Sequence, residues 1–343
     1  MRHYPRGSRE LLGPFLRFGT QDTVDWFAQR GVRLKTEDDG RMFPVTDDSQ
    51  TIVSCLWETA KKAGVEVQLS ARVERLEPQP GGGWQVHLTG QAPMPADRVL
   101  AATGSSEAVW DTLSGLGFEI VPPVPSLFTF NCKDARLQAL AGIAVPDAGV
   151  QVQGTKLSAR GPVLVTHWGL SGPAILRLSA WGARDLHRLN YNFTLRINWL
   201  SEQTQAEAFE DLQQFKSTAA RKQTGANAQF GLPQRLWERL VTAAGIAREQ
   251  RWADTGKQAL QNLAAELTAG QFAVRGKSTF KEEFVTAGGV DLWEINFKTF
   301  ESKRFPGLFF AGEVLDIDAI TGGFNFQAAW TAGWIAGNNL VLT

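Results

Sequence analysis

The residues with the clearest capacity for chemistry lie near the C-terminus. A predicted buried strand, Gly307–Gly312, ends on a glycine, Asp316 follows in the next loop, and Thr321-Gly322-Gly323 opens a predicted helix. A glycine at a strand end lets a ligand approach the backbone closely, and the first N–H groups of a helix attract an anion, a carbonyl oxygen or a delocalised ring charge. Taken alone, the paired glycines before a helix are better explained by tight turning.

Two other residues could do chemistry. His167 could face a ligand, but a single histidine beside a tryptophan is more often a packing residue, and we favour that interpretation. Ser171 departs from the G-x-S-x-G pattern of serine hydrolases because Pro173 stands where the last glycine should be. The four histidines have no metal-ligand spacing, so we expect no metal site, and no catalytic acid or base can be named.

The composition excludes several classes of protein. The 343 residues hold 35 basic and 35 acidic side chains, a balance that argues against a dedicated nucleic-acid binder. Cys55 and Cys132 are too few for a disulfide framework and are expected to be buried or half-buried free thiols. Residues 1–13 do not resemble a signal peptide, and no apolar stretch is long enough to span a bilayer. We expect a cytoplasmic protein with a small-molecule substrate and no nucleic-acid or membrane partner; the oligomeric state is not indicated.

Alternating helices and strands in the first third of the chain indicate an α/β fold. The predicted elements are two helices at 20–29 and 49–64, a strand at 65–69, two strands around a turn within 71–88, and a buried parallel strand at 97–102. Thr20 can cap the first helix. The second helix and the strand at 65–69 form one helix–strand unit.

The pattern of residue types along the sequence changes at Pro122–Pro125. Residues 127–165 predict short strands separated by glycine and proline turns. Residues 201–269 are rich in Gln, Ala, Glu and Leu and predict helices, and residues 272–298 return to strand-like alternation. A last helix is predicted from 324 to 337.

Several segments together resemble one protein family. They are His3–Arg6, Asp38–Pro44, Ala102–Gly104, Thr166–Pro173, Thr299–Lys303 and Gly307–Gln327. The last is similar to the C-terminal flavin-binding motif of flavoproteins with two dinucleotide-binding domains. The whole set resembles the HI0933-like family of FAD-dependent oxidoreductases, which includes YhiN-like, BaiN-like and aminoacetone-oxidase-like proteins, and it covers essentially the whole chain.

The resemblance implies a three-part α/β architecture. An FAD/NAD(P)-binding Rossmann-like domain would comprise residues 1–122 and 305–343. A β-barrel-like domain of residues 124–200 and 270–304 and a helical domain of residues 201–269 would be inserted into it.

The resemblance also implies where FAD would lie. The stretch from Gly312 through Glu313 to Asp316 would follow the pyrophosphate and ribityl chain, with Asp316 as a contact. Backbone N–H groups near the pyrimidine edge of the isoalloxazine, where reduced flavin is negative, would come from Gly322, Gly323, Phe324 and Asn325.

The adenine side would involve the strand at Val73, whose backbone would meet the base, and the turn Thr103-Gly104, which would pass beside the dinucleotide. The implied function is FAD-mediated redox chemistry on a small molecule. Reoxidation by oxygen and exchange with NAD(P)H both stay open.

One feature of such flavoproteins is absent from this sequence. No strand is followed by a GxGxxG turn and helix, the unit that cradles the diphosphate, so the Rossmann-like domain is expected to be incomplete at its N-terminal side. A misplaced start or truncation, a separate polypeptide that supplies the ADP half, and a degenerate paralogue each explain this. Loss of that unit would expose apolar faces and unpaired strand edges. The alternative function is a non-catalytic scaffold that no longer binds FAD.

Overall fold

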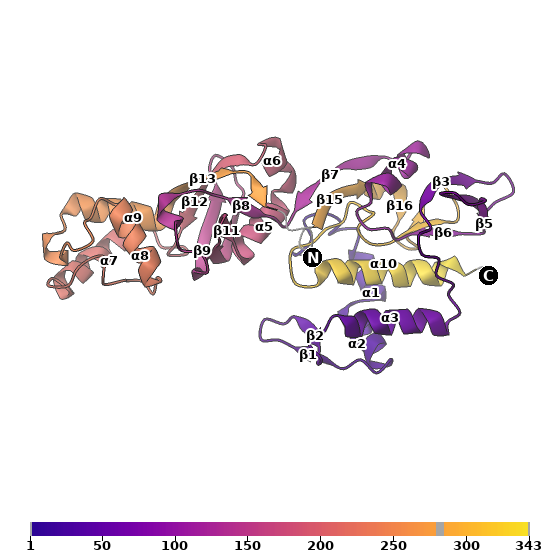
Figure 1. Ribbon diagram of the computed structural model, residues 1–343, viewed down its shortest axis with the longest axis horizontal. Helices are drawn as coiled ribbons and strands as arrows, with labels where there is room; N and C mark the ends of the chain where they lie inside the picture. The colour runs from indigo at the N-terminus through magenta and orange to yellow at the C-terminus, as the bar shows by residue number, and fades with distance from the viewer. Residues whose placement is uncertain (1, 279–284, 342–343) are drawn as a thin grey trace. The chain divides into compact units, whose positions relative to one another are not determined.

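In a computed structural model of the chain, which describes residues 2–278 and 285–341, the protein forms two compact units (Figure 1). Unit 1 comprises Met1–Pro123 and Thr286–Thr343, and unit 2 comprises Val124–Val285. Each unit has its own cluster of buried apolar side chains. Unit 2 is therefore an insertion into the chain of unit 1.

Unit 1 is built from helices and short strands. Its first part contains α1 (Leu12–Arg17), α2 (Thr20–Ala28), β1 (Leu34–Thr36), β2 (Met42–Pro44), α3 (Gln50–Lys62), β3 (Val73–Pro78), β4 (Trp84–Leu88), β5 (Met94–Ala96), β6 (Val99–Ala101), α4 (Glu107–Gly115) and β7 (Ile120–Ser126). Its second part contains β15 (Val285–Val290), the 3-10 helix Leu292–Glu294, β16 (Ile295–Asn296), β17 (Glu301–Ser302), β18 (Leu308–Phe310) and α10 (Phe324–Leu340).

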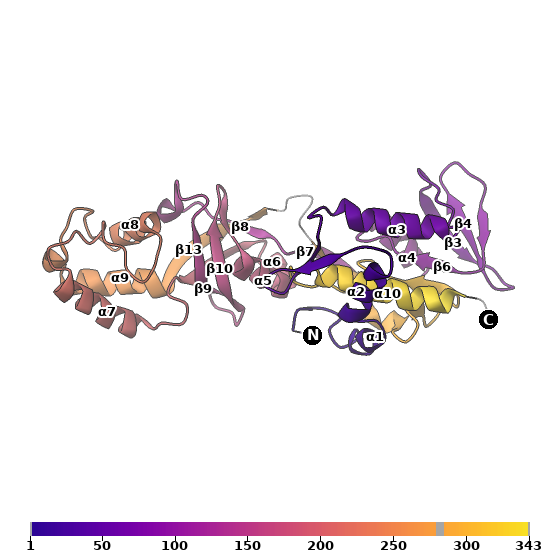
Figure 2. The same cartoon turned by 90° about the horizontal axis from the view of Figure 1, so that it is seen from below.

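The sheet that matters for the candidate site has the strand order β16-β17-β18-β6. β6 and β18 are parallel, with Leu308 opposite Val99 and Phe310 opposite Ala101. Both strands are apolar, and β18 is buried along its whole length, as expected for a parallel strand covered on both faces. α10 packs against β18, α1 and α2 (Figure 2).

Most predicted elements of unit 1 are confirmed. The predicted helices correspond to α2, α3 and α10, and the glycine-rich turn joins β3 and β4 as an antiparallel hairpin. The cap of α2 is a correction: the residue at the cap position is Gly19, and its N–H donates to the carboxylate of Asp22 at 2.7 Å. Thr20 is already the first helical residue.

The predicted strand Val65–Leu69 is wrong, because these residues form no strand. Their apolar side chains are exposed: Val65 by 55%, Val67 by 47% and Leu69 by 80%. A strand needs a neighbour to accept its backbone hydrogen bonds, and within the described residues this segment has no paired strand beside it. Alternation alone therefore did not suffice to make a strand.

Unit 2 combines one large sheet with helices. Its elements are β8 (Thr129–Asn131), the 3-10 helix Ala135–Leu137, β9 (Ala144–Val152), β10 (Ser158–Val165), β11 (Gly169–Ser171), α5 (Pro173–Trp181), α6 (Ala183–Arg188), β12 (Asn192–Asn198), α7 (Gln205–Thr218), α8 (Gln234–Ala243), the 3-10 helix Trp252–Asp254, α9 (Lys257–Ala269), β13 (Gly270–Arg275) and β14 (Lys277–Ser278). The predicted helical segment is confirmed as α7, α8 and α9, which gather beyond one side of the sheet (Figures 1 and 2).

The large sheet is strongly curved. Its strand order is β13-β12-β9-β10-β11-β8-β14, and its two edge strands are consecutive in the chain, separated only by Gly276. Gly276 has φ +92°, a conformation that side-chain-bearing residues rarely adopt. Its N–H donates to the carbonyl of Tyr191, just before β12, and its carbonyl accepts from the N–H of Asn131, the last residue of β8. The sheet thus bends round toward itself without being a closed barrel.

The boundaries of the two units differ in part from those of the three predicted domains. The first boundary falls between Pro123 and Val124, and the chain returns to unit 1 at Thr286, so residues 286–304 belong to unit 1. The sheet and helices of unit 2 share one buried cluster. Part of the strand run predicted at 272–298 lies outside the described residues. In the described part of the chain, none of the helices has the length and apolar character needed to cross a bilayer.

Candidate functional site

The candidate site begins where β6 and β18 end. Because the two strands are parallel neighbours, their carboxyl ends meet at one edge of the sheet, the edge at which α/β proteins bind ligands. Thr103-Gly104 leaves this edge after β6, and Gly312-Glu313 leaves it after β18. The Ser105 hydroxyl donates to Glu313 Oε2 at 3.1 Å, which joins the two connections directly. The fold therefore brings these four predicted residues together.

Gly312 is also in contact with the helix that follows. It has φ +79°, and a Cβ at this position would lie 3.4 Å from the Cβ of Ala329 in α10. A side chain here would strain the backbone, because residues with a side chain rarely adopt this φ. The backbone conformation at the end of β18 therefore favours glycine.

The start of α10 offers backbone donors without a side-chain cap. Gly322 has φ +129°, and Gly323, the residue at the cap position, has φ +82°. No side chain caps the helix, and no acidic residue lies in its first turn. Gly323 is exposed, and a Cβ on it would meet no atom within 4 Å. The partial positive end of this 17-residue helix therefore faces open space.

Three side chains fix this helix start. The carboxamide of Asn325 accepts from the N–H of Ala319 at 2.8 Å and donates to the Ala319 carbonyl at 3.2 Å. The Phe324 ring stacks on His3 with 4.2 Å between ring centroids, and the Phe324 carbonyl accepts from the Tyr4 hydroxyl at 2.7 Å. The predicted residues Phe324 and Asn325 thus use their side chains to hold the loop and the N-terminal segment.

Three carboxylates follow β18. Burial raises the pKa of the Glu313 carboxyl, the hydrogen bond from Ser105 lowers it, and the charge of Asp318 raises it. Asp316, the predicted ribityl contact, is buried, and its N–H donates to the Val290 carbonyl at 3.1 Å. Asp318 is fully buried and forms an ion pair with Arg6.

Sequence reasoning missed several of the residues that shape this site. Arg6, His3 and Tyr4 lie in a segment that contributed to the family resemblance, but only their contacts with the C-terminal loop show what they do. Trp110 of α4 donates to the Val314 carbonyl at 2.9 Å and holds the same loop. The adjacent glycines 288 and 289 were the available signal for a close backbone approach, since a Cβ on Gly289 would lie 2.6 Å from the Val314 oxygen.

The structure does not place Val73 with the other predicted residues. It is half-buried at the start of β3, opposite Leu88, in the separate sheet β3-β4-β5. Within unit 1, α4 packs against β3. The adenine contact of Val73 stays a prediction.

The remaining candidates are His167, the two cysteines and possible metal ligands. His167 is exposed, so the packing interpretation is wrong. Cys132 is buried and Cys55 half-buried, as expected of free thiols, and burial raises the pKa of Cys132 to about 12. Among residues 2–278 and 285–341, no three His, Cys, Asp or Glu side chains are grouped so as to hold a metal ion.

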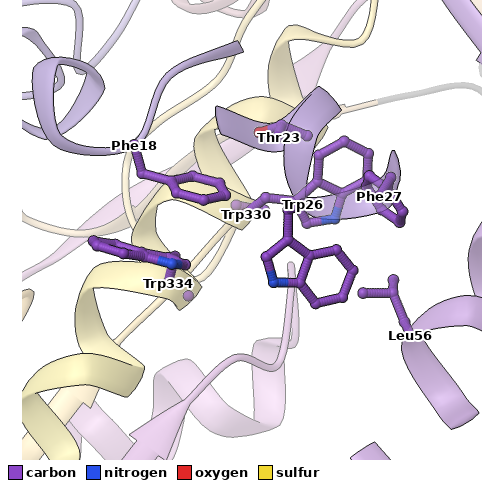
Figure 3. A pocket seen from close by; sticks show the side chains of 9 residues that line it. Phe18, Thr23, Trp26, Phe27, Leu56, Trp330 and Trp334 are labelled. Atoms are coloured by element: carbon purple, nitrogen blue, oxygen red, sulfur yellow. The ribbon is translucent and has the colours of Figure 1, made fainter. Parts of the chain in front are cut away.

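An aromatic pocket of about 260 Å³ lies along the side of α10 in unit 1 (Figure 3). Trp334 stacks on Phe18 with 5.0 Å between ring centroids. The lining residues are Phe18, Thr23, Trp26, Phe27, Leu56, Ala329, Trp330, Gly333 and Trp334. Most of these side chains are aromatic or aliphatic, so the pocket suits an apolar group.

The neighbouring helix α3 has no buried residue, and its Val53, Leu56 and Trp57 are exposed by 53%, 38% and 49%. β6 is the edge strand of its sheet. Among the described residues, unit 1 thus has exposed apolar side chains on α3, and β6 has a paired strand on one side only.

The residues present fit one half of FAD. The uncapped start of α10 and the glycine-lined loop after β18 offer the backbone donors and close approach that an isoalloxazine and its ribityl chain need. For the ADP half, the sequence contains no GxGxxG turn to cradle a diphosphate. The residues present thus match the flavin half of the dinucleotide.

The fold and the site define a protein with a Rossmann-like unit, whose ligand edge lies at the carboxyl ends of parallel strands, and an inserted second unit. The sequence profile described as "HI0933-like protein Rossmann domain" matches residues 1–339. The chain belongs to the HI0933-like family.

Three curated relatives are similar over most of the chain. The "Ribosomal RNA dihydrouridine synthase" of Escherichia coli (strain K12) is 29% identical over 95% of this chain and 80% of its own length. The protein of the same name from Haemophilus influenzae is 28% identical, over 93% and 79% respectively. The "3-dehydro-bile acid delta(4,6)-reductase" of Clostridium scindens is 26% identical, over 97% and 82%.

Proposed function

We propose that this protein is a flavin-dependent oxidoreductase that uses FAD to saturate a carbon–carbon double bond conjugated to a carbonyl group. The observation that carries the proposal is the uncapped start of α10, with Gly322 and Gly323 in positive-φ backbone, at the ligand edge of the β6–β18 pair. Membership of the HI0933-like family supports it.

The names of the relatives support the proposal that the reduced double bond is conjugated to a carbonyl group. A dihydrouridine synthase saturates the C5–C6 bond of uracil, which is conjugated to the C4 carbonyl. A reductase of 3-dehydro bile acids that acts at positions 4 and 6 saturates bonds conjugated to the C3 ketone. The two substrates differ in size and polarity but share an electron-poor alkene. We therefore infer the reaction class from what the two share.

The chemistry balances as a two-electron reduction. A reduced flavin held at the start of α10 would supply the two electrons as a hydride equivalent to the alkene carbon far from the carbonyl, the carbon beside it would take a proton, and NAD(P)H is the proposed reductant. The protein's own contribution is positioning: the amides at the start of α10 stabilise negative charge, and Asn325 keeps them in place through Ala319.

The test uses the purified 343-residue chain reconstituted with FAD. Flavin binding gives an absorbance band near ~450 nm, a property of the cofactor itself. After anaerobic reduction with dithionite, we expect the band to return on addition of a cyclic enone or of uridine-containing RNA, and not on addition of the matching saturated ketone or dihydrouridine. A chain that takes up no flavin contradicts the flavin proposal. A reduced flavin that neither alkene reoxidises contradicts the reaction class alone.

A further inference from the structure

The two units carry opposite charge, which the neutral total conceals. Residues 124–285, which make up unit 2, hold 19 Lys and Arg side chains against 13 Asp and Glu. The remaining residues, which make up unit 1, hold 16 against 22. Unit 2 therefore has a surplus of six positive charges and unit 1 an equal surplus of negative ones. The net charge of zero for the whole chain is therefore no argument against a polyanionic partner of unit 2.

Part of the positive charge of unit 2 is gathered around one pocket. The pocket has a volume of about 220 Å³ and lies between α8 and the loop that precedes β9. It is lined by Leu140, Arg235, Glu238, Arg239, Thr242 and Arg248. Arg235 and Arg239 are one helical turn apart on α8, so their side chains share a face. Three exposed guanidinium groups therefore surround one hollow.

Carboxylates neutralise little of this charge. Arg235 donates to the Ala139 carbonyl and Arg239 to the Gln138 carbonyl, the latter at 3.4 Å, and neither acceptor carries charge. Arg248 lies 3.6 Å from Glu238, whose other oxygen accepts from Gln234 at 3.0 Å. Among the lining residues, one carboxylate thus serves three guanidinium groups, and the two carbonyl bonds orient Arg235 and Arg239 while leaving most of their N–H donors available.

The positive surface continues beyond the pocket. A Cβ on Gly225 would lie 2.9 Å from the Arg248 carbonyl oxygen, so the segment around Gly225 runs beside Arg248. The backbone of Gln223 pairs with Arg251, next to the exposed Arg221 and Lys222. From residue 219 to 252 the sequence holds six cations, all exposed, and two acids. A track of this kind suits a ligand with phosphates in series better than a single small anion.

We propose that the pocket of Arg235, Arg239 and Arg248 binds a phosphate group of an RNA backbone, with the neighbouring cations contacting further phosphates. Arginine forks match phosphate geometry, and contacts of this type position a nucleic acid without reading its sequence. The inference deepens the proposed function, because it makes the alkene a pyrimidine base carried on RNA. The binding itself requires no flavin.

The test measures fluorescence anisotropy of a labelled single-stranded RNA oligonucleotide with the full chain over a range of salt concentrations. We expect the R235A/R239A variant to bind at least about fivefold more weakly, and the slope of log affinity against log salt to fall by about 0.7 for each phosphate that is no longer neutralised. Arg188→Ala is the matched control, because Arg188 is an exposed unit 2 arginine already paired with Asp185 at 2.6 Å. Its binding should equal that of the unaltered chain.

Glu238→Gln is a second variant with the opposite expected effect. Removing the one carboxylate among the lining residues should strengthen RNA binding severalfold, a gain that misfolding could not produce. Equal affinities of the unaltered, R235A/R239A and E238Q chains would overturn the proposal. Displacement of the RNA by pyrophosphate, at an ionic strength where sulfate leaves it bound, would assign the pocket to a small phosphate and also overturn it. RNA binding without alkene reduction would refute the proposed reaction and leave this site standing; alkene reduction without RNA binding would do the reverse.

Discussion

The side chain of Asn325 hydrogen bonds to both backbone groups of Ala319, six residues earlier in the chain. Ala319 is fully buried, so its N–H and carbonyl cannot hydrogen bond to bulk water and bond to Asn325 instead. One carboxamide thus completes the loop after β18 and fixes the first turn of α10.

Asn325→Ala should destabilise unit 1 and weaken flavin binding. An orphaned buried polar group costs about 1–3 kcal/mol, so we expect a decrease of that order in the unfolding free energy measured in urea. Asn338→Ala is the control, because Asn338 is exposed near the end of the same helix and donates to the Trp334 carbonyl within that helix. Equal stability of the two variants would contradict the role given to Asn325.

Arg6→Met should be more damaging still. The Asp318 carboxylate is fully buried, and its ion pair with Arg6 joins the N-terminal segment to the loop after β18. Removing one partner of a buried pair costs about 3–5 kcal/mol, because an uncompensated charge stays behind. Urea unfolding measures the decrease. Arg188→Ala, which breaks an exposed pair, should change stability by at most about 1 kcal/mol. A small effect of Arg6→Met would show that other contacts hold the loop.

Glu313 should make stability depend on pH. Burial raises the pKa of its carboxyl in the folded protein, so the folded state holds this proton more tightly than the unfolded state does. The resulting contribution to stability is full below the ordinary glutamate pKa of about 4.3 and is lost as the pH rises through the raised value. Glu313→Gln should remove this decline and be more stable than the unaltered chain at neutral pH. Unfolding curves at several pH values test this, with Glu58→Gln, an exposed glutamate of α3, as the control.

The two cysteines should differ in reactivity. Burial raises the pKa of Cys132 to about 12, so its thiolate is scarce at pH 8, whereas Cys55 is half-buried on α3. Iodoacetamide should label Cys55 first, as followed by mass spectrometry. In Cys55→Ser, labelling should require denaturant. Rapid labelling of Cys132 in that variant under native conditions would show that its strand region opens readily.

FAD and FMN should bind the 343-residue chain with affinities within a few-fold of each other. The flavin-side donors are present, but the sequence holds no GxGxxG cradle, so the ADP half of FAD adds little affinity. Titration of the chain with each flavin, followed by fluorescence, measures the ratio. A strong preference for FAD would reveal a diphosphate site built from other residues of this chain. No binding of either would favour a non-catalytic scaffold.

The sequence by itself determined the family, the α/β class and most local elements. The strands β6 and β18, the β3–β4 hairpin and α10 follow from short patterns of apolar residues, glycines and turn residues, which act over a few positions of the chain. The motif at Gly312 and Gly322-Gly323 also predicted a loop and a helix start, which the structure confirms, because backbone geometry at glycine is a local property.

Only the tertiary structure decided which distant residues meet. Arg6 and Asp318 lie 312 positions apart, and Ser105 and Glu313 are joined only because β6 and β18 are neighbours. The same principle explains the wrong strand at Val65–Leu69, since alternation supplies a face but not a paired neighbour. It also explains the charge: a total of zero is fixed by composition, whereas its separation into a basic and an acidic unit depends on where the chain folds into two. Long-range pairing is set by packing of whole elements, which no short window of sequence contains.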